Sequence, residues 1–114
     1  MTDGDKADVL QASVEHYNRM LQGIIENPDK LKGTPSTATF KKVVGETWGA
    51  ADCPLCQKFY TVNDGCGRCP VKEYYGGCSG TPHAFIPKAA DYIDLYRTLI
   101  MERNVLDMMR LYLS

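Results

Sequence analysis

The sequence predicts a mainly helical α+β domain, in which two long amphipathic helices pack around a small treble-clef-like zinc centre with a short hairpin. Two observations carry this prediction. Apolar residues recur at helical spacing near both ends of the chain, and five cysteines are concentrated in its middle. A chain of 114 residues, 44% of them hydrophobic, has room for one domain with a modest core. We therefore expect one domain, 1–114, made of an N-terminal helix (1–27), a connector (28–52), a zinc-binding centre (53–83) and a C-terminal helix (87–114).

The N-terminal helix is predicted from an apolar face whose members are four, three, four and three residues apart. These residues are Leu10, Val14, Tyr17, Leu21 and Ile24. Asp3 and Asp5 suit a helix start, and Asn27 before Pro28 disfavours continuation.

The connector is ambiguous, because residues 38–44 fit a strand and a short helix equally well, and 36–50 is left open between the two. Trp48 is expected to be core that covers the metal site. Pro87 suits the first turn of the C-terminal helix. One face of that helix carries Leu95, Leu99, Leu106, Met109 and Leu113. The polar run 102–104 interrupts the apolar pattern, so the helix is either continuous, kinked or divided in two.

The cysteines form two Cys-x-x-Cys pairs and a single residue further on. Nine residues separate Cys56 from Cys66, and eight separate Cys69 from Cys78. Two such pairs supply four thiolates for tetrahedral zinc. The predicted ligands are Cys53, Cys56, Cys66 and Cys69.

Two other ligands remain open. Cys78 can replace Cys66 or Cys69, because the glycines before it allow a tight return of the chain. His83 is a less favoured ligand. An iron–sulfur cluster also accepts four cysteines, but this spacing matches neither common ferredoxin pattern.

A treble-clef arrangement is favoured over a plain zinc ribbon. Residues 59–62 are predicted as a strand and 63–65 as a turn. The run from Pro70 to Gly77 is predicted as a short helix with proline at its first position and glycine at its end. Cys69 then lies at a helix N-terminus, which favours a thiolate.

Residues 53–83 resemble a loose, largely uncharacterised group of small phage and prophage proteins. The shared pattern is Cys-x-Leu-Cys, a short spacer, Cys-x-x-Cys-Pro, a further Cys and then Thr-Pro. The matching residues are Cys53, Leu55, Cys56, Cys66, Cys69, Pro70, Cys78, Thr81 and Pro82. The resemblance covers about a third of the chain, and it implies a phage-type accessory protein that works in the host bacterial cytosol, with no particular activity.

The sequence argues against an enzyme. A zinc deaminase needs a His-x-Glu motif, which is missing, and the chain has only two histidines, one of them (His16) within the predicted first helix. Thiol-redox chemistry needs a βαβ context, which is also missing. No signal peptide or membrane span is predicted. We expect a single structural zinc ion and no catalytic residue.

The expected activity is binding to a host protein, which it modulates or inhibits. Nucleic acid is the second choice, because the middle of the chain is only mildly basic and both ends are acidic. The candidate contact residues lie near the second cysteine pair and at the end of the last helix, which is also the expected face of a homodimer. They are Arg68, Lys72, Tyr74, Tyr75, Leu111 and Tyr112.

Overall fold

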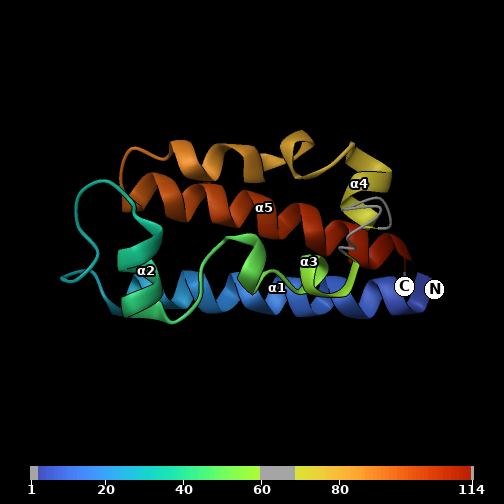
Figure 1. Ribbon diagram of the computed structural model, residues 1–114, viewed down its shortest axis with the longest axis horizontal. Helices are drawn as coiled ribbons and strands as arrows, with labels where there is room; N and C mark the ends of the chain where they lie inside the picture. Colours follow the sequence, from blue (N-terminus) through green and yellow to red (C-terminus); the bar gives the residue numbers. More distant parts are fainter. Residues whose placement is uncertain (1–2, 60–68, 114) are drawn as a thin grey trace.

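The computed structural model describes residues 3–59 and 69–113, and all of their regular structure is helical (Figure 1). In chain order the elements are α1 (Asp3–Glu26), α2 (Thr37–Val44), the 3-10 helix η1 (Ala50–Asp52), α3 (Pro54–Phe59), α4 (Pro70–Tyr75), the 3-10 helices η2 (Cys78–Gly80) and η3 (Pro82–Lys88), and α5 (Tyr92–Leu113).

The two long helices lie side by side and run in opposite directions, which brings both chain ends to the same end of the molecule (Figure 1). Their facing sides hold the most deeply buried apolar residues, Leu10, Met20, Leu95 and Leu99. The prediction of two long amphipathic helices is confirmed, but the C-terminal helix begins at Tyr92 and not near Pro87, which lies within η3. α5 is one continuous helix, because Glu102 of the polar run turns inward and is buried.

The connector forms a helix, α2, across the end of α1. Ser36 caps its start by accepting a hydrogen bond from the Thr39 amide, and Gly45 ends it in the left-handed conformation at φ 99°. Phe40 is fully buried, with its ring 5.2 Å from that of Trp48 and stacked on Tyr92. Trp48 is therefore core, and its role in covering a metal site stays a prediction.

The α+β prediction is wrong for the described part of the chain, since residues 3–59 and 69–113 contain no strand. Phe59, the expected start of the hairpin, is the last residue of α3. Pro54 supplies the first turn of this helix, and Leu55 and Phe59, four residues apart, bury one side of it. Cys56 consequently lies inside a helix and not in the tight Cys-x-x-Cys turn, the zinc knuckle, that a treble clef requires. The rest of the expected hairpin, 60–65, lies outside the described residues.

Candidate functional site

The described cysteines enter the molecule from three separate segments. Cys53 immediately precedes α3 and Cys56 lies within it, Cys69 is the residue before α4, and Cys78 begins η2. Cys69 is buried, and Cys53 and Cys78 pack against the hydrophobic core. Cys66 and Arg68 lie outside the described residues.

Tyr17 of α1 shows that three of these cysteines face one region of the interior. Its ring is buried, and burial raises the pKa of the phenol well above its ordinary value. At the alkaline pH where the phenol ionises, the Glu102 carboxylate and then the thiolates of Cys53, Cys78 and Cys56 raise this pKa further. Residues 53–56 and Cys78 therefore approach the same side of α1, although more than twenty residues separate them in the sequence.

These thiols have the chemistry of zinc ligands, but they do not form a complete site by themselves. Among residues 3–59 and 69–113, no group of three or more His, Cys, Asp or Glu side chains could hold a metal ion. The predicted set of Cys53, Cys56, Cys66 and Cys69, with Cys78 as the alternative, includes one residue beyond the described part. The zinc site therefore remains a prediction.

The short helix predicted after Cys69 is confirmed. Pro70 occupies its first position, and Gly76 ends it in the left-handed conformation at φ 78°. The chain then turns so sharply that a Cβ on Gly80 would lie 2.0 Å from the carbonyl oxygen of Tyr75. Only glycine fits at this position, and the turn returns Cys78 toward α4.

His83 of η3 is engaged elsewhere. Its Nε2 atom lies 3.0 Å from the carbonyl oxygen of Trp48. A carbonyl oxygen only accepts hydrogen bonds, so Nε2 carries the hydrogen and the lone pair that could bind a metal is on Nδ1. This contact therefore leaves His83 open as a ligand through Nδ1, and the preference for cysteine ligands rests on the sequence pattern.

A buried carboxyl group, Glu102 of α5, lies beside the segment that carries Cys78. The Thr81 hydroxyl oxygen is 2.7 Å from Oε2 of Glu102 and 2.8 Å from the carbonyl oxygen of Cys78. One hydroxyl hydrogen cannot serve both acceptors, so the contacts are all satisfied when Glu102 is protonated and donates to Thr81.

The burial of Glu102 favours its neutral form. Burial raises its pKa above the ordinary value, against the opposing effects of the Thr81 hydrogen bond and of His83. Its Oε1 atom has no hydrogen-bond partner, which an uncharged carbonyl oxygen tolerates better than a carboxylate. In the sequence, Glu102 stands out only as part of the polar run 102–104 that interrupts the apolar pattern. Its place three residues after Leu99 and four before Leu106 is the signal that it faces the core.

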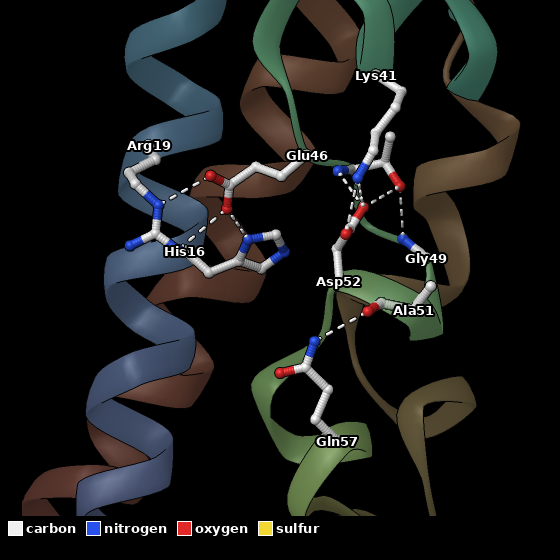
Figure 2. Close-up of polar contacts among 9 residues, drawn as sticks. His16, Arg19, Lys41, Glu46, Gly49, Ala51, Asp52 and Gln57 are labelled. Atoms are coloured by element: carbon white, nitrogen blue, oxygen red, sulfur yellow. Dashed lines mark hydrogen bonds and ion pairs between the residues drawn. The ribbon is translucent and has the colours of Figure 1, made fainter.

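A polar clamp holds the connector that leads to Cys53 (Figure 2). Glu46 accepts hydrogen bonds from Arg19 at 2.9 and 3.1 Å and from Nδ1 of His16, a side chain only 1% exposed. Burial raises the pKa of Glu46, but the hydrogen bonds from Arg19 and His16 outweigh it, and the net pKa is lowered. The clamp joins α1 to the chain just after α2. Nothing in the sequence pattern indicated this pairing.

A second carboxylate fixes the next turn of the connector. Asp52 accepts hydrogen bonds from Lys41 and from the Thr47 amide, both at 2.9 Å, and these contacts lower its pKa despite a small opposing effect of burial (Figure 2). Gln57 of α3 donates to the Ala51 carbonyl at 2.9 Å. Together these bonds determine where α3 and its two cysteines begin.

The predicted contact residues that the structure describes meet at one end of the molecule. Tyr74 and Tyr75 of α4 line a groove of about 330 Å3 together with Met108, Met109, Tyr112 and Leu113 of α5. The rings of Tyr74 and Tyr112 are 6.1 Å apart and nearly perpendicular. Leu111 is exposed beside them, and exposed Lys72 donates to the Gly76 carbonyl.

No protein-family model, no curated protein and no solved structure matches this chain. The helices described here are all too short or too polar to cross a membrane.

Proposed function

We propose that this chain is a non-enzymatic, zinc-stabilised module of phage type, which binds a host bacterial protein in the cytosol and modulates or inhibits it. The observation that supports this proposal is the distribution of exposed apolar side chains. Nine large hydrophobic residues are exposed in the described chain, and all nine lie on or beside one face of α5. Exposed apolar surface of this extent is typical of protein interfaces.

The face is a single stripe along the whole helix. We define the α5 stripe as the side chains of α5 that point away from the core in successive turns. They are Ile93, Arg97, Met101, Asn104, Met108, Leu111 and Tyr112.

Three neighbouring elements widen the stripe. Ile25 at the end of α1 shares a hollow with Ile93, and Phe85 of η3 shares one with Met101. Tyr74 and Tyr75 line the groove described above together with Met108 and Tyr112. A continuous apolar surface with a groove at its C-terminal end is suited to an apolar segment of another protein.

The charge of the stripe favours protein over nucleic acid. Arg97 is its only charged member, and it already pairs with Asp94 at 2.7 Å. Binding to phosphates needs several cations on one face, and this surface does not offer them.

The proposed zinc is structural. The described cysteines belong to the segments of α3, α4 and η2, and a metal that joins them would hold α4 against the end of α5, where Tyr74 and Tyr75 complete the groove. Structural zinc contributes about 10–16 kcal/mol in small fingers, which suits a region built of short helices.

Capture from a bacterial lysate tests the proposal. The tagged chain should retain a discrete protein in both low and high salt, because apolar contacts are not screened. Met108→Glu, at a side chain 69% exposed, should lose that protein. Gln22→Glu, exposed on α1 outside the stripe, is the matched control and should retain it. Nucleic acid that is retained at low salt and released steeply with salt would instead support the second choice.

A further inference from the structure

The α5 stripe has the dimensions of a helix-pairing seam. It extends from Ile93 to Tyr112, which is about 28 Å along the helix axis at ~1.5 Å per residue. From Ile93 to Leu111 successive members are three or four residues apart, and Tyr112 adjoins the last of them. This is the spacing at which two helices pack along their length. The surface that fits so straight and narrow a seam is another helix.

We infer that a second copy of this chain covers the stripe, with the two α5 helices antiparallel about a two-fold axis at Asn104. The inference rests on the proposed function in one respect, since it takes the same face as a protein-binding surface. It adds the identity of the occupant when no host protein is present.

Charge selects the antiparallel arrangement. A parallel pair would place the exposed Arg97 against the Arg97 of the other copy, where the ion pair of each with its own Asp94 only partly offsets the repulsion. In the antiparallel pair Arg97, seven residues before the axis, lies opposite Leu111 and the adjoining Tyr112. The guanidinium can then stack on an exposed tyrosine ring. The two arginines lie about 21 Å apart, well beyond the screening length of about 8 Å in physiological salt.

Asn104 at the axis faces its own copy. An amide both donates and accepts, so two asparagines related by a two-fold axis satisfy each other. Arg103 already donates to Oδ1 of Asn104 at 3.3 Å, which leaves the amide nitrogen to donate across the axis. One polar residue within an apolar helix seam specifies register and orientation, and Asn104 has this position between Met101 and Met108.

Self-pairing and host binding are then mutually exclusive, because they use one face. A host protein that binds the stripe must replace the second copy. The dimer is the resting form, and it protects the apolar surface from non-specific association.

Sedimentation velocity across a concentration series tests the inference with charge-swapped variants. The wild type should be a dimer that dissociates on dilution. Asn104→Asp and Asn104→Lys each place like charges against each other at the axis, and each should weaken the dimer by about tenfold or more. An equimolar mixture of the two variants should restore it, since opposite charges then meet. Circular dichroism checks that both exposed substitutions leave the fold intact.

The outcomes separate this inference from the proposed function. A wild type that is monomeric up to its solubility limit overturns self-pairing, as does a dimer that both variants leave unchanged. If such a monomer still captures a host protein that Met108→Glu loses, the proposed function stands without the dimer. A dimer that responds as expected, in a chain that captures no protein, supports the inference and removes the proposed host target.

Discussion

Replacing the buried acid Glu102 by glutamine should make the protein more stable at neutral pH. Glutamine keeps the shape of the side chain, and its amide can donate to Thr81 as the protonated acid does. The carboxyl is 3% exposed. In the unfolded chain it ionises near its ordinary pKa of 4.5, whereas burial raises its pKa in the folded protein. Folding above pH 4.5 is therefore coupled to proton uptake by Glu102, and folding of the glutamine variant is not.

The size of the effect follows from this proton. Each pH unit between the unfolded and folded pKa corresponds to about 1.4 kcal/mol, so the gain at pH 7 has a ceiling of about 3.4 kcal/mol, reached if the folded acid is still fully protonated there. Because the folded pKa is raised, the stability of the wild type is fully present below pH 4.5 and declines as pH rises toward the folded pKa. Glu102→Gln should thus match the wild type in acid and exceed it at neutral pH, by no more than this ceiling.

Urea unfolding at several pH values measures the difference directly. Glu73→Gln is the control, because its carboxylate is half exposed and bonded to Lys6, and such a pair contributes about 0–1 kcal/mol. A destabilising Glu102→Gln at neutral pH would mean that Glu102 is an ionised partner of a nearby cation. A gain that does not vary with pH would equally refute the proton argument.

Three further changes test the support of the site. Glu46→Ala leaves a buried imidazole N–H without its acceptor and should lower the free energy of unfolding by about 1–3 kcal/mol. Since the folded pKa of Glu46 is lowered, the stability that Glu46 contributes should be present above pH 4.5 and disappear as pH falls through the folded pKa. Urea titrations that show no loss of this contribution in acid would contradict the argument. Gly23→Ala places a Cβ 2.6 Å from the Val44 side chain and should lower the free energy of unfolding by about 1–3 kcal/mol, and with it the melting temperature. Adding Val44→Ala in the same chain should restore part of the melting temperature. If calorimetry shows no recovery, α1 and α2 are not tightly packed at Gly23. Cys69→Ser should release zinc and abolish cooperative unfolding. His83→Ala should keep about one zinc per chain by elemental analysis. Loss of metal in the His83 variant would make the four-thiolate assignment wrong.

The parts of the fold that follow local rules could be predicted from the sequence. The apolar repeats of α1 and α5 and the proline and glycine that bound α4 each act within one or two helical turns. The strand predicted to start at Phe59 is wrong at that residue, because aromatic and β-branched residues over so short a run are a weak signal, and Pro54 with the Leu55 and Phe59 pair favours a helix.

The parts of the site that depend on long-range contacts could not be predicted. Glu102 meets Thr81 across twenty-one positions, and His16 meets Glu46 across thirty. Their partners are fixed by how α1, α5 and the connector pack, and no periodicity encodes that packing. The convergence of Tyr74 with Tyr112 is of the same kind, although each residue was separately expected to contact a partner.

Methionine methyl NMR tests the central claim, that the α5 stripe is a protein-binding face, most directly. Met101 and Met108 are exposed on the stripe, whereas Met20 is fully buried and serves as an internal reference. With the methyl groups labelled, adding the protein captured from the lysate should shift or broaden the signals of Met101 and Met108 and leave that of Met20 in place. Unchanged signals from Met101 and Met108 while the complex forms would show that binding uses another surface.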